Sequence, residues 1–236
     1  MHQALYRVYR PKTFDDIVGQ EHITSVLKNQ VAEDTVNHAY LFCGPRGTGK
    51  TSTAKVLARA VNCTGEIKPC YQCKSCEQSS LDIIEMDAAS NNSVDNIRDI
   101  RDNIVFMPSV SRYKVYIIDE VHMLSQGAFN ALLKTLEEPP SHVIFILATT
   151  EPQKIPATVL SRCQRFDFKK IDDSILTQQL EKVLLQEGKE FEADAVQCIV
   201  QKSDGGMRDA LSLLDKVMNL SKLTKQEVIQ ALGEVQ

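Results

Sequence analysis

The stretch from residue 39 to residue 62 constrains the fold of this chain most, because it joins three patterns in one order. An apolar run, Ala39–Cys43, precedes Gly44–Thr51, which fits G-x-x-x-x-G-K-[ST], and apolar residues then recur at helical spacing. Glycines in such a loop let backbone N–H groups point at an anion, and the helix that follows adds partial positive charge. The stretch predicts a phosphate-binding loop between a buried strand and a helix, in preference to a chance glycine-rich turn.

Two residues at the end of this loop have the chemistry that a nucleotide site needs. We expect Lys50 to reach the β and γ phosphates of the nucleotide, and the Thr51 hydroxyl to hold Mg²⁺. The sequence therefore predicts ATP and Mg²⁺ as ligands.

A second stretch supplies carboxylates and hydroxyls. An apolar strand that begins at Lys114 ends in Asp119 and Glu120, and the next buried strand ends at Thr149 and Thr150. Ligands of an open α/β sheet bind at these strand ends, so we expect Asp119 near the phosphate loop, holding the water shell of Mg²⁺. Glu120 would polarise the attacking water, and one of the two threonine hydroxyls would touch the γ phosphate. Two acids after a strand can also form a solvated turn, but the glycine loop favours ATP hydrolysis.

Four cysteines follow the helix of the phosphate loop. Cys70, Cys73 and Cys76 have C-x-x-C-x-x-C spacing, and Cys63 lies before a turn that contains glycine and proline. Four thiolates can converge on one tetrahedral ion, so we expect a structural Zn²⁺ site with no position left for water. An iron–sulfur cluster is the alternative, although its usual bacterial run places a fourth cysteine downstream, before a proline. Reduced thiols on a loop would be the third interpretation.

Composition excludes some classes of protein. The 236 residues carry 27 basic and 31 acidic side chains, a net charge of −4, which argues against the strongly basic surface of a stand-alone nucleic-acid binder. The N-terminus has no apolar signal core, and the longest strongly apolar run, Val143–Ala148, is too short to span a bilayer. We therefore expect a cytoplasmic protein with no membrane partner and with reduced cysteines.

The pattern of elements predicts two domains. Residues 1–168 would form an α/β nucleotide-binding domain with a zinc-binding insert at about residues 63–76, and residues 169–236 a small all-helical domain. Residues 5–20 come before any expected regular element and would form an arm packed on a domain. The expected helices cover residues 21–31, a segment from 94 that Pro108 ends, 175–187, 193–202, 207–220 and a last one from 225.

These residues together resemble the AAA+ ATPases, and within them the γ/τ subunits of bacterial DNA polymerase III clamp loaders. The resemblance covers the whole chain, and no motif departs from the family pattern. The matching segments are Tyr9–Phe14, Val18–Gln20, Gly44–Thr51, the four cysteines, Asp119–Leu124, Ala148–Pro152, Ser161–Cys163 and Gly205–Leu211.

The resemblance implies a five-stranded parallel sheet with flanking helices and a helical lid, and it implies a role for each site residue. Asp119 would assist the metal and Glu120 would activate water. Thr150 would be the first sensor of the γ phosphate, and Arg208 the second, acting from the lid, although its place in the sequence alone suggests a surface arginine. Arg162 would be inserted into a neighbour's ATP site. The nucleotide-binding set would comprise Tyr9, Arg10 and Val18 around the adenine, with Gly44, Pro45, Arg46, Gly47, Thr48, Gly49, Lys50, Thr51 and Ser52 around the phosphates.

The implied function is ATP-driven loading of a sliding clamp onto primed DNA, as part of a DNA polymerase holoenzyme at the bacterial replisome. The implied partners are the other clamp-loader subunits, the sliding clamp and primer–template DNA, within a hetero-oligomer when the protein is full length. The collar that assembles such subunits has no counterpart in the sequence, so we expect an N-terminal fragment. Two alternatives are a DNA-translocating AAA+ motor of the branch-migration type and a non-hydrolysing structural or switch subunit. The cysteines and the Ser161–Cys163 triplet argue against the motor; the presence of Lys50, Thr51 and Glu120 argues against the non-hydrolysing subunit.

Overall fold

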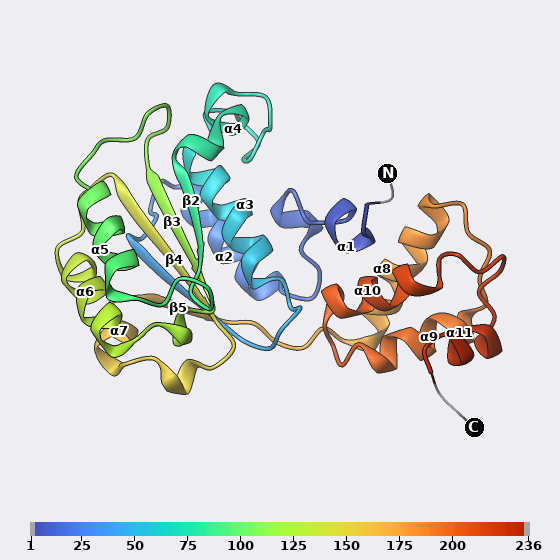
Figure 1. Ribbon diagram of the computed structural model, residues 1–236. Coiled ribbons are helices and arrows are strands. Elements are labelled where there is room, and N and C mark those ends of the chain that lie inside the picture. The colour runs from blue at the N-terminus through green and yellow to red at the C-terminus, as the bar shows by residue number, and fades with distance from the viewer. Residues whose placement is uncertain (1–2, 234–236) are drawn as a thin grey trace.

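The computed structural model describes residues 3–233, and a parallel β-sheet organises the first two thirds of them (Figure 1). The five strands lie in the order β2-β3-β4-β1-β5 and are all parallel. This arrangement confirms the predicted fold class. The strands are β1 (Ala39–Cys43), β2 (Ile83–Asp87), β3 (Lys114–Asp119), β4 (Val143–Thr149) and β5 (Gln164–Asp167).

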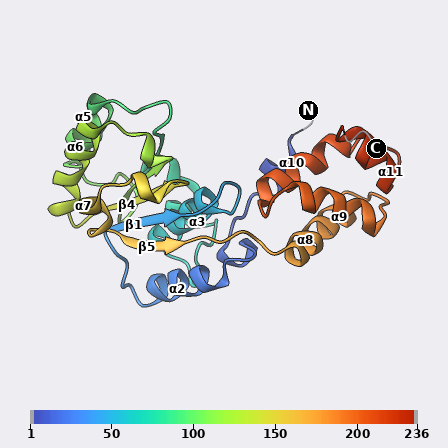
Figure 2. The ribbon, with the colours of Figure 1, turned by 90° about the horizontal axis from the view of Figure 1, so that it is seen from below.

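Helices cover both faces of the sheet, and alternating side chains of β1 show how. Leu41 and Cys43 pack in the core beneath α5, α6 and α7, whereas Tyr40 and Phe42 pack in the core beneath α2 and α3. Figure 2 shows α5 and α6 on one side of the strands and α2 on the other. These helices are α2 (Glu21–Ala32), α3 (Lys50–Asn62), α5 (Val94–Asn103), α6 (Gln126–Glu137) and α7 (Ala157–Leu160), with the one-turn α4 (Lys74–Glu77) after α3.

The strand register brings the important strand ends to one edge. Cys43 at the end of β1 lies opposite Thr149 at the end of β4, and Asp119 at the end of β3 lies opposite Asp87 of β2. The loop that follows β1 therefore emerges beside the ends of β3 and β4, as the sequence predicts.

The last part of the described chain is helical and has a hydrophobic core of its own. Leu176, Leu180, Val196, Ile199 and Leu214 are fully buried in it. The helices are α8 (Asp173–Gln186), α9 (Ala193–Lys202), α10 (Met207–Val217) and α11 (Lys225–Ala231), each within a few residues of its expected bounds. The position of the domain boundary at residue 168 stays a prediction.

Two local expectations were wrong. The arm is not free of regular structure, because a short helix, α1 (Leu5–Val8), packs against α10. Nor does α5 extend to Pro108: it ends at Asn103, where two side chains from outside the helix bind its last carbonyls. Lys114 Nζ donates to the Asn103 carbonyl at 2.9 Å, and His142 Nε2 lies 2.8 Å from the Ile104 carbonyl.

None of the helices in the described part of the chain combines the length and the apolarity that crossing a membrane requires.

A buried carboxylate fixes the loop between α5 and β3. Asp82 is 1% exposed and accepts backbone N–H bonds from Ser109 at 2.6 Å, Val110 at 2.9 Å and Ser111 at 2.8 Å. Burial alone would raise the pKa of Asp82, but these three bonds lower it below its ordinary value. Asp82 therefore accepts the backbone N–H bonds that water would otherwise accept in this segment, which has no regular secondary structure.

Asp82→Asn is predicted to lower the free energy of unfolding near neutral pH by about 1–3 kcal/mol, because an amide cannot accept all three bonds as a carboxylate does. Since the folded-state pKa lies below the ordinary value of 3.8, the stabilisation is present above that pH and is lost as the pH falls through the folded-state pKa. Urea denaturation over this acidic range should show a flatter pH dependence for the variant. The exposed Asp102 offers a control, Asp102→Asn, and equal curves for Asp82→Asn and wild type would contradict the assignment.

Candidate nucleotide site

The phosphate loop has little free space around its first glycine. Gly44 has a φ of +146°, and a Cβ there would lie 2.4 Å from the carbonyl oxygen of Phe168. Its N–H donates to the Thr149 carbonyl at 3.2 Å. The loop therefore begins in contact with the end of β4 and with the segment that leaves β5, and a side chain at position 44 would separate them.

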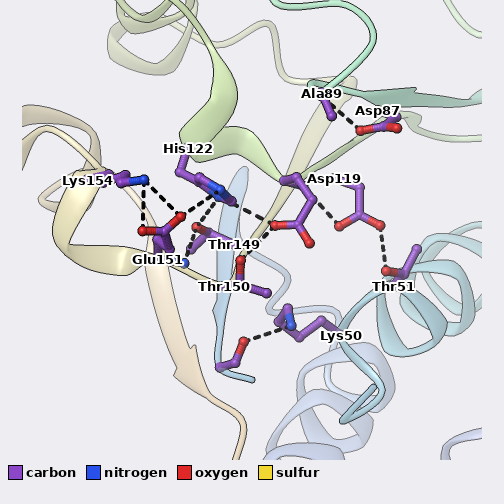
Figure 3. A network of polar contacts seen from close by, with 12 residues as sticks. Lys50, Thr51, Asp87, Ala89, Asp119, His122, Thr149, Thr150, Glu151 and Lys154 are labelled. Atoms are coloured by element: carbon purple, nitrogen blue, oxygen red, sulfur yellow. Dashed lines mark hydrogen bonds and ion pairs between the residues drawn. The ribbon is translucent and has the colours of Figure 1, made fainter. Parts of the chain in front are cut away.

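Lys50 begins α3 and points back into the loop (Figure 3). Its Nζ donates to the carbonyls of Gly44 at 2.8 Å and Pro45 at 2.7 Å, and the residue is 6% exposed. Burial lowers the pKa of Lys50, although the nearby Glu120 and Asp119 oppose this effect. The ammonium is thus held at the centre of the loop, where it can meet a phosphate.

Thr51 and Asp119 form the oxygen-rich part of the site. Thr51 Oγ1 donates to Asp119 Oδ2 at 2.6 Å, and the N–H of Glu120 donates to Asp119 Oδ1 at 3.0 Å. A hydroxyl and a carboxylate are the ligands that Mg²⁺ prefers, usually alongside water and phosphate oxygens, so these two residues suit that ion.

The carboxylate of Glu120 is held from the neighbouring strand. Thr150 Oγ1 donates to Glu120 Oε2 at 3.0 Å, and the backbone of Glu120 is left-handed, with a φ of +49°. The structure thus brings together the four residues that the sequence grouped for phosphate and metal chemistry, Lys50, Thr51, Asp119 and Glu120. It also places Thr150 beside the last of them.

A cavity of about 580 Å³ opens beside this cluster, between the sheet, the arm and α10. Among the predicted residues it is lined by Tyr9, Arg10, Arg46, Gly47, Gly49, Lys50, Thr51, Ser52, Asp119, Glu120 and Arg208. The other predicted residues, Val18, Gly44, Pro45, Thr48, Thr150 and Arg162, do not line it. Val18 packs instead on the helical core, and Thr48 is buried with its hydroxyl on the Pro45 carbonyl.

Sequence reasoning missed part of the lining, namely Tyr6, Arg7, Pro11, Met207 and Leu211. The sequence of the arm contains a pattern that could have indicated Tyr6 and Arg7: a tyrosine followed by an arginine occurs there and again at Tyr9 and Arg10. The ring of Tyr6 lies 5.2 Å from the guanidinium carbon of Arg208, and the hydroxyl of Tyr9 donates to Glu187 at 2.6 Å. Burial and this bond to Glu187 raise the pKa of Tyr9 to about 12.

The charges that line the cavity favour an anion. Among the described residues, five positively charged side chains line the cavity, those of Arg7, Arg10, Arg46, Lys50 and Arg208. The negative charges are the carboxylates of Asp119 and Glu120, which lie beside Thr51 on the side suited to a metal ion. A polyphosphate that carries a bound divalent ion satisfies both groups of charges.

The helical part of the chain touches the phosphate loop directly. A Cβ on Gly47 would lie 3.1 Å from Gly206 Cα, and the N–H of Arg208 donates to the Gly47 carbonyl at 3.4 Å. Gly47 and Gly206 therefore allow α10 to begin against the loop, and Arg208 lies at the cavity as a result.

Arg162 lies away from the cavity, just after α7. Its Nη2 donates to Glu137 of α6 at 2.7 Å, and its Nη1 donates to the Thr158 carbonyl at 2.7 Å. The side chain is one-third exposed. The guanidinium is thus fixed on the α6–α7 side of the domain, and its predicted role toward a neighbour stays a prediction.

The four cysteines converge at the far end of α3 from the loop. The sulfurs of Cys63, Cys70, Cys73 and Cys76 all lie within 4.8 Å of one another, and those of Cys63 and Cys73 are 4.0 Å apart. Tetrahedral zinc, with Zn–S bonds of about 2.3 Å, requires sulfur separations of about 3.8 Å, so the cluster fits the ion. Burial would raise the pKa of Cys73, but hydrogen bonds with the backbone and side chains of Thr64 and Cys76 lower it to about 6, whereas burial raises the pKa of Cys76 to about 12 and also raises that of Cys63.

Comparison with known proteins identifies the family and the fold. The family model "DNA polymerase III, delta subunit" matches residues 19–172, and the model "DNA polymerase III clamp loader subunit, ATPase lid domain" matches residues 175–222. The branch-migration motor RuvB of Thermotoga maritima has a similar structure, with a TM-score of 0.73 and 20% identity over 95% of this chain and 72% of that chain. At this identity the likeness shows a shared fold alone.

Curated relatives are much more similar in sequence. DNA polymerase III subunit tau of Bacillus subtilis is 59% identical over 93% of this chain, and that of Escherichia coli is 49% identical over 92%. The chain spans 40% and 35% of the lengths of these two relatives. Together with the family matches on both sides of residue 172, they show that the chain belongs to the tau/gamma family of DNA polymerase III clamp-loader subunits.

Proposed function

We propose that this chain is the ATP-binding and ATP-hydrolysing part of a clamp-loader subunit. The observation that carries the proposal is the convergence of Lys50, Thr51, Asp119 and Glu120 on one cavity, to which the helical lid contributes Arg208. ATP binding would tighten an assembly of such subunits around a sliding clamp and primer–template DNA, and hydrolysis would release both. The branch-migration alternative is supported only by the shared fold, whereas the sequence relatives are replication subunits.

The residues divide the chemistry among them. The backbone N–H groups of the loop and Lys50 would hold the phosphates, and Arg208 would reach them from the lid. Thr51 and Asp119 would hold Mg²⁺, which when bound neutralises charge on the phosphate oxygens. Glu120, directed by Thr150, would orient and polarise the attacking water. Tyr9 and Arg10, in the arm, would contact the base.

Two substitutions separate binding from turnover. Lys50→Ala should abolish ATP binding, because it removes the cation at the centre of the loop. Glu120→Gln should retain binding and lose turnover, because it removes the carboxylate and leaves the loop intact. Titration with a fluorescent ATP analogue and a phosphate-release assay measure the two effects. Lys55→Ala, on the same helix but ion-paired to Glu85, is the control, and equal loss of affinity in the Lys50 and Glu120 variants would contradict the division of roles.

We also propose that the four-cysteine cluster holds one structural Zn²⁺. Metal analysis of protein purified under reducing conditions without chelator should find about one zinc per chain. Cys73→Ser should lose the metal and lower the unfolding temperature more than it lowers nucleotide affinity, because the cluster lies at the other end of α3 from the loop. Cys198→Ser, outside the cluster, should keep both the metal and the stability. Wild-type protein without zinc would refute the proposal.

Arg162 is proposed to act on the ATP bound by a neighbouring subunit. Its place outside the cavity of its own chain and its ion pair with Glu137 support this proposal. An arginine supplied in trans is typically worth roughly 10³–10⁵ in rate, so the isolated chain should bind ATP yet hydrolyse it very slowly.

Arg162→Ala should leave the ATP affinity of the isolated chain unchanged and suppress turnover in the assembled complex. Mixed assemblies provide the decisive measurement: a subunit with Arg162→Ala should regain turnover at its own site beside a neighbour that supplies the arginine. Arg165→Ala, which removes an ion pair with Asp167 nearby, is the matched control. Two results would show that the role in trans is wrong. One is rapid hydrolysis by the isolated chain, and the other is loss of activity only at the ATP site of the substituted subunit itself.

A further inference from the structure

His122 is a buried imidazole beside the proposed catalytic carboxylate, and none of the roles above uses it. It lies in η3 (Val121–Met123), the single turn that follows β3, and its side chain is 6% exposed. The Glu120 side chain, by contrast, is 33% exposed. Glu120 lines the cavity and His122 does not, and Figure 3 shows the ring of His122 beside Thr149 and Glu151.

The two ring nitrogens face different partners. Nδ1 lies 3.1 Å from Thr149 Oγ1 and 3.4 Å from Glu120 Oε2, whereas Nε2 lies 3.3 Å from Glu151 Oε1. Thr149 Oγ1 in turn accepts the N–H of Glu151 at 3.0 Å. One edge of the imidazole thus meets the carboxylate that would activate water, and the other meets a second carboxylate.

The second carboxylate is itself fixed. Glu151 Oε2 lies 2.8 Å from Lys154 Nζ, an ion pair between the residue that precedes the turn η4 (Pro152–Lys154) and the last residue of that turn. Because Glu151 is anchored by Lys154 and by its own backbone, it can hold the ring in one orientation. The Nδ1 edge is then presented to Glu120 from a fixed position.

We propose that His122 is a positioning residue, which uses its Nδ1 edge to hold the Glu120 carboxylate in the direction required to activate water. Glu120 Oε2 accepts a hydrogen bond from Thr150 Oγ1 at the end of β4, and in this role a proton on His122 Nδ1, shared with Thr149 Oγ1, is the second donor, from η3. A carboxylate with one partner can rotate about its side-chain bonds, whereas two partners from different elements define its direction. The inference rests on the proposed ATPase function and concerns the rate of turnover, not nucleotide binding.

The experiment uses the full-length protein in its assembled complex, with sliding clamp and primed DNA. An asparagine amide can take the place of Nδ1, and a glutamine amide the place of Nε2, so His122→Asn keeps the group that faces Glu120 while His122→Gln keeps only the group that faces Glu151. We expect His122→Ala and His122→Gln to slow single-turnover hydrolysis by roughly 10- to 100-fold, the scale of a small misplacement of a reacting group, and His122→Asn to stay within a few-fold of wild type. The affinity for a fluorescent ATP analogue should be unchanged in all three.

Thermal unfolding of the variants separates positioning from packing. A role in packing alone would make the rates follow the unfolding temperatures, and would give no advantage to asparagine over glutamine at equal stability. Any result in which His122→Asn is no faster than His122→Gln, or in which His122→Ala hydrolyses ATP like wild type, overturns the inference. Failure of the underlying function is recognised separately, because wild type would then show no hydrolysis or Glu120→Gln would hydrolyse as fast as wild type.

Discussion

The close packing around Gly44 is the constraint on which the rest of the site depends. At this residue the end of β1 meets the carbonyl of Thr149 from β4, and Phe168, just beyond β5, donates its N–H to the Cys43 carbonyl at 2.7 Å. Strand β4 leads directly to Thr150, and the segment after Phe168 leads to the helical lid. The absence of a side chain at position 44 thus lets the loop, the segment that carries Thr150 and the start of the lid pack together.

Several polar groups proposed to meet the nucleotide or its metal have a partner within the chain. Lys50 binds loop carbonyls, Thr51 binds Asp119, and Thr150 binds Glu120. Nucleotide binding would therefore exchange one set of hydrogen bonds for another, and its net gain would come from the charge of the phosphates among the arginines of the cavity. Affinity would then depend strongly on ionic strength and on the presence of a divalent ion.

The sequence predicted the sheet and the phosphate loop well because both follow from local patterns. The glycine spacing from Gly44 and the apolar run that ends at Asp119 each correspond to one element. Contacts between distant segments were not predictable in this way. The ring of Tyr6 meets Arg208 across 202 positions of the chain, and α5 stops where Lys114 and His142 supply caps, which depends on the packing of β3 and β4. His122 was overlooked because a histidine after an acidic pair has many interpretations until its neighbours are known.

The arm between residues 5 and 18 takes part in two hydrophobic cores, the one beneath α2 and α3 and the one of the helical part. Phe14 and Ile17 are buried among the side chains of α2 and α3, whereas Leu5 is buried in the helical core, against which Val18 also packs. Burial of this segment therefore stabilises both of these cores. If the segment left one core, the other core would also be destabilised. The stabilities of the sheet and of the lid are thereby coupled through this one segment.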